Sequence, residues 1–215
     1  QLGSSDIEAR MKQKVAFLGL GVMGYPMAGW LSKHGYSVVV YNRTDSVAVR
    51  WLQEYQGQSA ASPAEAVVDA EIVFSCVGND DDVRAVLLGE QGALSYMQAG
   101  AVLVDHTTTS ATLARELAAA AATVNCGFID APVSGGQQGA ENGKLTVMCG
   151  GHGDDFQRVE AAIKSYAKSI QLMGEAGSGQ LCKMVNQICI AGVVQGLAEG
   201  INFAKRAGLD AAQVI

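Results

Sequence analysis

A lysine and two carboxamides near the end of the chain have the residue types and the spacing for proton transfer. Lys183 lies on a predicted helix after glycines spaced G-x-x-G-x-G in the stretch 174–187, and Ser178 is the expected N-cap of that helix. Asn186 and Gln187 lie three and four residues further on, so their carboxamides share the helical face of Lys183 and can hold its ammonium group in place. These residues predict a proton donor with a fixed direction. The competing interpretation is an ordinary lysine on a solvated surface.

A second glycine pattern follows the first apolar stretch of the chain, residues 14–18. Glycines in a G-x-G-x-x-G pattern lead from this expected strand into a helix that ends at Gly35. In a dinucleotide fold the first glycine makes a tight turn, the second lets the backbone approach a pyrophosphate, and the third packs helix against strand. The helix N-terminus then faces the anion. We therefore predict cofactor contacts from the whole loop: Gly19, Leu20, Gly21, Val22, Met23 and Gly24. A glycine turn without a ligand is the alternative.

The residues after the next strand, 37–41, indicate which dinucleotide is used. NAD-binding versions of the fold usually place an Asp or Glu there to accept from the ribose 2′-OH, whereas this chain has Asn42, Arg43 and Thr44. Arg43 can pair with a 2′-phosphate while Asn42 and Thr44 donate to it. The sequence favours NADP as cofactor. NAD remains possible if Arg43 is an ordinary exposed charge at a strand end.

Two further strand ends are expected to reach the cofactor, because ligands of open α/β folds bind outside the carboxyl ends of the strands. Val77 ends the buried strand 71–77, and we assign its backbone and that of Gly78 to the ribose side. Thr108 lies in a run of hydroxyl residues after strand 101–104 and is placed near the nicotinamide. His106 in the same run is expected to be structural, since no carboxylate at fixed spacing orients it. The aspartates at 80–82 are expected to favour the start of a helix through its dipole, and no metal site is predicted.

A glycine loop after the expected strand 128–133 is a candidate substrate site. Ser134, Gly135 and Gly136 offer a hydroxyl and bare amide donors that could hold a small carboxylate. A plain glycine turn is the alternative. Because this loop and Lys183 both follow strands in the second half of the sheet, we expect them to face one cleft.

Strands that alternate with helices predict an α/β fold, with a Rossmann-like, mostly parallel sheet and helices on both faces. We divide the chain into a frayed or appended N-terminal tail (1–13), a dinucleotide-binding domain (14–176), and a long interdomain helix with the start of an all-α domain (177–215). The remainder of that helical domain is expected to be missing.

The interdomain helix is predicted to run from Gly179 to about Arg206, on the order of 40 Å at a rise of 1.5 Å per residue. Gly192, Gly196 and Gly200 recur every fourth residue along one stripe of it. Because glycine destabilises an isolated helix, this stripe predicts a surface where another helix approaches closely.

Composition bounds the class of protein. A hydrophobic content of 49% with 17% charged residues fits a globular chain, and a net charge of −6 with scattered Lys and Arg argues against a nucleic-acid partner. The five cysteines form no C-x-x-C pair and lie in apolar segments, which fits reduced thiols and a cytoplasmic location. We recognise no signal peptide before the first strand. The longest uncharged helical stretch, 184–198, is short for a membrane span, so no membrane partner is expected.

With these motifs in view, residues 14–215 resemble the β-hydroxyacid dehydrogenase family, which includes 3-hydroxyisobutyrate dehydrogenase, tartronate semialdehyde reductase and glyoxylate/succinic semialdehyde reductase. The resemblance rests on G-L-G-V-M-G-Y-P-M at 19–27, D-A-P-V-S-G-G at 130–136 and the stretch 174–187, in the family's order and spacing. It implies a Rossmann domain followed by an all-α domain, with Lys183 catalytic, the loop 134–136 and Asn186 or Gln187 on the substrate, and Thr108 near the cofactor. Residues 42–44 depart from the NAD-dependent members and look like the NADPH-using semialdehyde reductases.

The predicted function is reversible hydride transfer between NADP(H) and a small semialdehyde or β-hydroxy acid, with Lys183 as proton donor in reduction and proton acceptor in oxidation. An NAD-dependent 3-hydroxyisobutyrate dehydrogenase is the first alternative. A non-catalytic nucleotide-binding or assembly module is the second, although such a module does not need a proton donor. We expect a small carboxylate as substrate, a homo-oligomer formed through the helical region, and weak or no activity until the missing helices are restored.

Overall fold

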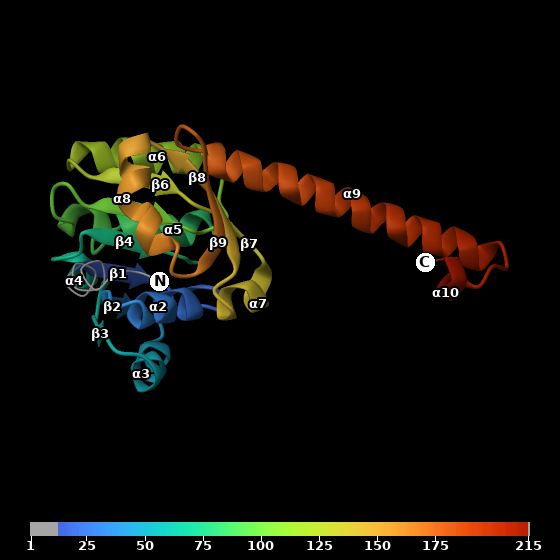
Figure 1. The fold of residues 1–215 in the computed structure, drawn as a ribbon. Helices are drawn as coiled ribbons and strands as arrows, with labels where there is room; N and C mark the ends of the chain where they lie inside the picture. The colour runs from blue at the N-terminus through green and yellow to red at the C-terminus, as the bar shows by residue number, and fades with distance from the viewer. Residues whose placement is uncertain (1–12, 215) are drawn as a thin grey trace.

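A sheet of nine strands forms the centre of the part of the chain that the structure describes, residues 13–214 of a computed structural model (Figure 1). The predicted N-terminal tail lies outside these residues apart from Gln13. The strands are β1 (Lys14–Leu18), β2 (Ser37–Tyr41), β3 (Gln58–Ser59), β4 (Ile72–Ser75), β5 (Val102–Asp105), β6 (Gly127–Asp130), β7 (Val133–Ser134), β8 (Leu145–Gly151) and β9 (Ala167–Gly174). The helices are α2 (Gly24–Lys33), α3 (Asp45–Glu54), α4 (Pro63–Val67), α5 (Asp80–Leu88), the 3₁₀ turn η1 (Ala93–Tyr96), α6 (Ala111–Thr123), α7 (Gly136–Glu141), α8 (Gly153–Ile163), α9 (Ser178–Arg206) and α10 (Ala211–Val214).

The strand order is β3-β2-β1-β4-β5-β6-β8-β7, with β9 beside β8. Every pair from β3 to β6 is parallel, β8 runs antiparallel to β6, and β9 runs parallel to β8. This confirms the predicted mostly parallel sheet. The chain moves outward from β1 to β3 and then crosses back to β4 on the other side of β1. Such a reversal opens a crevice at the carboxyl ends of β1 and β4, where ligands of this class of sheet bind.

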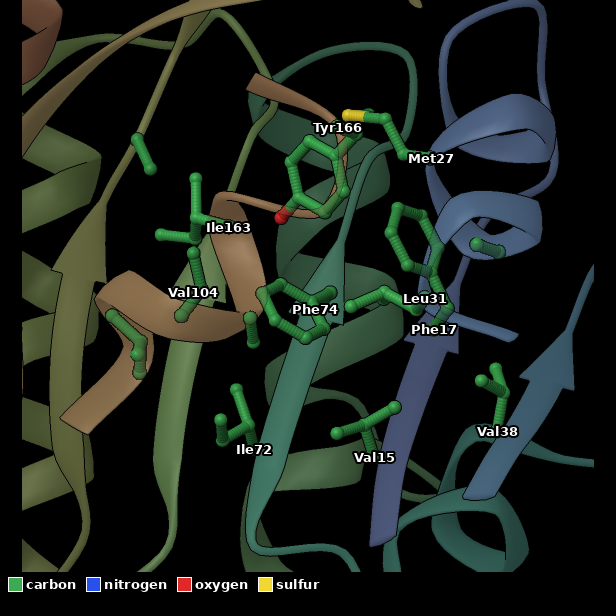
Figure 2. Packing of buried hydrophobic residues seen from close by; sticks show 14 of the residues in the cluster. Val15, Phe17, Met27, Leu31, Val38, Ile72, Phe74, Val104, Ile163 and Tyr166 are labelled. Carbon is green, nitrogen blue, oxygen red and sulfur yellow. The ribbon is translucent and has the colours of Figure 1, made fainter. Parts of the chain in front are cut away.

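The two faces of the sheet carry separate cores, because alternate residues of a strand point to opposite sides. Val15 and Phe17 of β1 pack on the face covered by α2, α3 and α8, whereas Ala16 and Leu18 pack on the face covered by α4, α5 and α6. Figure 2 shows the first core, in which the rings of Phe17 and Phe74 stack with centroids 5.8 Å apart. Burial on both sides explains why the inner strands read as continuous apolar runs. It also fixes the carboxyl ends of the strands relative to one another.

The segment after β6 differs from the sequence-based expectation of one strand over 128–133. The strand ends at Asp130, and after Ala131 and Pro132 the short β7 pairs with β8 instead. Pro132 has no N–H to continue the ladder, which accounts for the break. The segment that follows contains α7, and Gly135 and Gly136 turn the chain into it with φ of 130° and 61°.

The long helix α9 was expected from Gly179, and the structure starts it at Ser178 and ends it at Arg206. It extends away from the sheet (Figure 1), and most side chains beyond its first turns are exposed, including Ile188 at 71% and Phe203 at 72%. A Cβ built on any glycine of the predicted 192/196/200 stripe would meet nothing within 4 Å in the described part of the chain. The partner helix inferred from that stripe therefore remains a prediction.

By length and composition alone, α9 could cross a membrane. It has 29 residues, and its most apolar window of 18 residues has a mean hydropathy of 1.4. This differs from the expectation based on the shorter run 184–198, because the helix continues past the charged residues that bound that run. Helices of soluble proteins pass the same test, so it does not by itself place the chain in a membrane.

Candidate active site

The glycine loop between β1 and α2 has the geometry that a dinucleotide requires. Gly19 has φ of 98°, and a Cβ there would collide with the carbonyl of Cys76, so only glycine fits this turn. A Cβ on Gly24 would collide with the carbonyl of Gly19, which shows how closely α2 packs on the loop. A Cβ on Gly21 would meet nothing within 4 Å. The loop is therefore closed where it packs and open at the middle glycine, where a diphosphate approaches in folds of this kind.

A cavity of about 590 Å³ lies in front of this loop. Most of the predicted cofactor residues line it: Gly19, Gly21, Val22, Met23, Gly24, Asn42, Arg43, Thr44, Val77 and Gly78. The opposite wall comes from α5 and includes Ala85 and Val86. Leu20 and Thr108 do not line it: Leu20 is buried at 3% exposure, and Thr108 is exposed between two buried threonines.

Asn42 has a structural task in addition to the predicted contact with the cofactor. Its Oδ1 accepts from the N–H of Leu20 at 2.9 Å, and its Nδ2 donates to the carbonyl of Thr44 at 3.0 Å. The side chain therefore braces the glycine loop against the end of β2 and keeps one N–H of its Nδ2 for a ligand. Two other side-chain donors stand at this strand end, the guanidinium of Arg43 and the hydroxyl of Thr44. The described residues provide no hydrogen-bond partner for the Thr44 hydroxyl.

Arg43 faces an acidic residue across the cavity. Its Nη1 lies 3.4 Å from Oδ1 of Asp82, which stands on the first turn of α5. The Arg43 side chain is 87% exposed and that of Asp82 33% exposed. Asp82 was expected only to favour the start of α5 through the helix dipole. The structure adds that its carboxylate borders the cofactor cavity.

A buried carboxylate holds the strand end behind the cavity. Oδ1 of Asp105 accepts from the hydroxyl of Ser75 at 2.8 Å and from the N–H of Thr107 at 3.1 Å. The hydroxyl of Thr107 accepts from the N–H of Val77 at 3.0 Å, so this chain of bonds reaches the cavity wall. Burial raises the pKa of Asp105 to about 6, and the hydrogen bonds from Thr107 and Ser75 offset only part of that effect.

His106 is structural, as the sequence indicated. It is 2% exposed, with Nδ1 2.7 Å from the carbonyl of Ala131 and Nε2 2.8 Å from the hydroxyl of Tyr166. Because a carbonyl can only accept, Nδ1 carries the proton and Nε2 accepts from Tyr166. Burial lowers the pKa of His106 to about 4, against a raising effect of the bond to Ala131. The imidazole is neutral at pH 7 and has no free nitrogen for substrate.

The start of α9 is held by the ends of β5 and β6. Asp130 is fully buried, and its carboxylate accepts from the N–H of Gly177 at 2.7 Å and from the N–H of Gln180 at 2.9 Å. The carboxamide of Gln180 in turn accepts from the N–H of Thr109 at 3.0 Å and donates to the carbonyl of Thr107 at 2.7 Å. These contacts satisfy N–H groups that the first turn of a helix leaves without a partner. They place the start of α9 at the same edge of the sheet as the cofactor cavity.

The expected N-cap of this helix was Ser178, and that expectation is wrong. The N-cap is Gly177 with φ of 93°, and no side chain of the capping position bonds to the helix. The carboxylate of Asp130, distant in sequence, takes the role instead. Gly179 allows this close approach, because a Cβ there would collide with the carbonyl of Met148.

Lys183 follows this anchored turn and is half-buried. Within residues 13–214 its ammonium group makes no hydrogen bond, so the predicted contacts from Asn186 and Gln187 are not formed in this structure. Gln187 is exposed. Nδ2 of Asn186, however, is buried without any hydrogen-bond partner in the described chain. Buried amide groups are normally paired, so this donor is an exception on the helical face of Lys183.

The loop 134–136 and the start of α9 both contact strand β8. Ser134 pairs with Thr146 of β8, and α9 packs over Met148 and Gly150 further along that strand. Ser134 is half-buried, while Gly135 and Gly136 are exposed. No hydrogen bond joins Ser134 to Lys183 among the described residues. The loop and the lysine thus flank β8, and a shared cleft remains a prediction.

Two family profiles match the chain in succession. Residues 14–174 match the profile described as the NAD binding domain of 6-phosphogluconate dehydrogenase. Residues 177–215 match the profile described as NAD-binding of NADP-dependent 3-hydroxyisobutyrate dehydrogenase. The chain belongs to the 3-hydroxyisobutyrate dehydrogenase family.

Relatives within the 3-hydroxyisobutyrate dehydrogenase family agree with this result. An uncharacterised oxidoreductase of Shewanella frigidimarina is 60% identical over 202 residues, which cover 94% of this chain and 69% of that protein. The probable 3-hydroxyisobutyrate dehydrogenase-like 2 of Arabidopsis thaliana is 44% identical over 93% of this chain and 66% of its own length. The structure of Mycobacterium tuberculosis 3-hydroxyisobutyrate dehydrogenase with L-serine superposes with a TM-score of 0.87 at 31% identity, over 92% of this chain and 67% of that one. The chain thus spans about two thirds of the length of these relatives.

Three residues that shape the site in this member of the 3-hydroxyisobutyrate dehydrogenase family had no assigned role, or a different one, at the level of sequence. Asp130 is the last residue of β6, as Asp105 is of β5, and an acid at a strand end could have suggested a cap for a later helix. Gln180 occupies the third position of α9, where Glu and Gln are frequent partners of the helix start. No pattern in the sequence indicated the role of Asp82, because its partner Arg43 is far away along the chain.

Proposed function

We propose that this protein catalyses reversible hydride transfer between NADP(H) and a small semialdehyde or β-hydroxy acid, with Lys183 as the proton donor in reduction. The observation that carries the proposal is the anchored start of α9, where Asp130 and Gln180 tie the lysine-bearing helix to the ends of β5 and β6, at the same edge of the sheet as the dinucleotide cavity. Membership of a family of NAD(P)-dependent dehydrogenases supports it.

The cofactor supplies a hydride from C4 of its reduced nicotinamide ring when bound. In the reduction, the carbonyl carbon of the substrate gains that hydride while the carbonyl oxygen takes a proton from the ammonium of Lys183. The products are the hydroxy acid, the oxidised cofactor and a neutral lysine, which solvent reprotonates. In the oxidation, neutral Lys183 removes the hydroxyl proton.

Other residues of the chain orient the substrate in this proposal. The unpaired Nδ2 of Asn186 donates to a substrate oxygen on the same helical face as Lys183. The hydroxyl of Ser134 and the exposed N–H groups of Gly135 and Gly136 bind the carboxylate. A small acid is favoured because L-serine, which accompanies the solved relative, is itself a β-hydroxy acid.

The proposed preference for NADP rests on Arg43 and Thr44, which border the cavity at the end of β2 where NAD-specific folds place an acid. One observation favours the alternative of an NAD-dependent 3-hydroxyisobutyrate dehydrogenase. Asp82 brings a carboxylate to the cavity from α5, and a carboxylate can accept from a ribose hydroxyl.

The function is tested by supplying glyoxylate and succinic, methylmalonic and tartronic semialdehydes with NADPH or NADH to the chain extended to the length of its relatives. We expect cofactor oxidation with at least one of these substrates, and faster turnover with NADPH. Gly21→Val should abolish binding of both cofactors without loss of stability, because its side chain enters open space at the loop. Gly153→Val, at an equally open position at the start of α8, is the control. No oxidation with any pair, or cofactor binding that survives Gly21→Val, would refute the proposal.

We further propose that the apolar surface of α9 mediates self-association. Val193 and Ile188 are 70% and 71% exposed, and a helix this apolar gains free energy by burying its surface against other helices. Val193→Asp should lower the molar mass measured by sedimentation equilibrium. An unchanged mass, or a monomer before substitution, would exclude this surface.

A further inference from the structure

We propose that Asp82 weakens the preference of the site for NADP(H) by competing with the 2′-phosphate for Arg43. The inference rests on the proposed function in one respect, that a nicotinamide dinucleotide occupies the cavity. It concerns a residue on α5, outside the strand end that usually decides between the two cofactors.

The three aspartates that open α5 have different surroundings. Asp80 accepts from the hydroxyl of Ser110 at 2.6 Å and from its N–H at 3.1 Å, which ties α5 to the start of α6. The Asp81 side chain is 98% exposed and lies 3.8 Å from Arg84 on the outer face of the helix. Asp82 alone of the three borders the cofactor cavity. Of these three adjacent aspartates, Asp82 therefore faces the cofactor cavity, and Asp80 and Asp81 do not.

Asp82 and Arg43 are the charged residues among those that line the cavity within the described chain. They come from opposite walls and lie 3.4 Å apart. Asp82 packs against the backbone of Gly78, where a Cβ would collide with its Oδ2. The carboxylate is thus held in place, whereas the more exposed guanidinium is free to turn toward a ligand.

The two cofactors meet this pair differently. A 2′-phosphate carries about two negative charges, so it must draw Arg43 away from Asp82 and is repelled by the carboxylate that remains. The 2′-hydroxyl of NADH carries no charge and can donate to Asp82. Asp82 therefore penalises NADPH and is neutral or favourable toward NADH. The effect is modest, because a solvent-exposed ion pair changes an equilibrium by about fivefold at most.

The test compares Asp82→Asn with Asp81→Asn, which makes the same charge change on the same helical turn outside the cavity. Dissociation constants for NADPH and NADH are measured by fluorescence titration of the chain, without a substrate. We expect Asp82→Asn to tighten NADPH binding about threefold to fivefold and to leave NADH binding unchanged or weaker. Asp81→Asn should change neither constant by more than about twofold, the size expected of a distant, screened charge.

A double-mutant cycle identifies Arg43 as the group for which the two anions compete. In an Arg43→Ala background, Asp82→Asn should tighten NADPH binding less than it does in the native chain, because the ion pair is already absent. Urea unfolding of each variant confirms that the fold is retained.

The outcomes separate this inference from the proposed function. If the unsubstituted chain binds neither cofactor, the proposed function fails and the inference fails with it. If both cofactors bind but Asp82→Asn and Asp81→Asn shift NADPH affinity equally, only the long-range charge matters and the inference alone is overturned. The same holds if Asp82→Asn weakens NADPH binding.

Discussion

The carboxylate of Asp130, at the end of β6, accepts the N–H of Gln180 at 2.9 Å and so anchors the first turn of α9. Its other oxygen accepts from Gly177 at 2.7 Å. The proposed proton donor, Lys183, follows on the next turn of the same helix. The position of the lysine therefore depends on a buried charge that touches neither the lysine nor the cavity.

Replacement of Asp130 should loosen this anchor. We expect Asp130→Ala to lower the free energy of unfolding by about 3 kcal/mol or more, since each hydrogen bond to a charged group contributes about 1.5–3 kcal/mol. Asp154→Ala, which removes an exposed carboxylate from the first turn of α8, is the matched control and should cost less than about 1 kcal/mol. Urea denaturation measures both. Equal losses in the two variants would show that Asp130 is no more than an ordinary helix-dipole charge.

Glycines within α9 should respond to alanine in opposite directions. Gly179→Ala places a Cβ against the carbonyl of Met148 and 2.8 Å from that of Asp130, so it should destabilise the protein by about 1–3 kcal/mol. Gly192→Ala meets nothing within 4 Å and should stabilise it by up to about 1 kcal/mol, the difference in helix propensity. Thermal unfolding distinguishes the two. A destabilising Gly192→Ala would instead indicate a close helix contact along the glycine stripe.

The stability of the protein should depend on pH through Asp105. Its carboxyl has a pKa of about 6 in the folded chain against an ordinary value of 3.8, so between these values the folded state binds a proton that the unfolded state has lost. The contribution of Asp105 is therefore complete below pH 3.8 and declines as the pH rises to about 6, by roughly 3 kcal/mol. Urea unfolding of the native chain and of Asp105→Asn across this range isolates the effect, because other titrating groups cancel in the difference. A constant difference would contradict the raised pKa.

His106 should oppose this trend in the native chain. Burial lowers its pKa from 6.5 to about 4, so its contribution is complete above pH 6.5 and is lost as the pH falls toward 4. Asp105→Asn removes the carboxyl whose contribution rises as the pH falls, and leaves the contribution of His106, which decreases. The free energy of unfolding of this variant should therefore fall more steeply on acidification than that of the native chain. A stability of Asp105→Asn that does not fall between pH 6.5 and 4 would argue against a neutral, buried His106.

The sequence predicted those parts of the site that depend on local patterns. The three glycines after β1, the strand ends at 42–44 and 77–78, and the long helix that carries Lys183 all follow from residue type and spacing within a short window. The structure places most of these strand-end residues around one cavity. The alternation of strands and helices was sufficient to predict the mostly parallel sheet.

Contacts between distant side chains could not be predicted in the same way. The cap of α9 comes from Asp130 instead of Ser178, because the packing of α9 on β8 brings a buried carboxylate under the helix start. The sequence did not indicate that the Asn42 carboxamide would accept from Leu20 on the glycine loop and donate to the carbonyl of Thr44 after β2. Asp82 meets Arg43 only because α5 and β2 border the same crevice.

The most direct test of the account is the rate of hydride transfer in Lys183→Ala, measured under single-turnover conditions with saturating NADPH in the chain extended to the length of its relatives. Loss of the proton donor should slow the step by about 100-fold or more, while NADPH affinity stays near that of the native chain. Lys205→Ala, which removes a lysine from the last turn of the same helix, should leave the rate unchanged. A Lys183→Ala variant that transfers hydride as fast as Lys205→Ala would contradict the central claim that Lys183 supplies the proton.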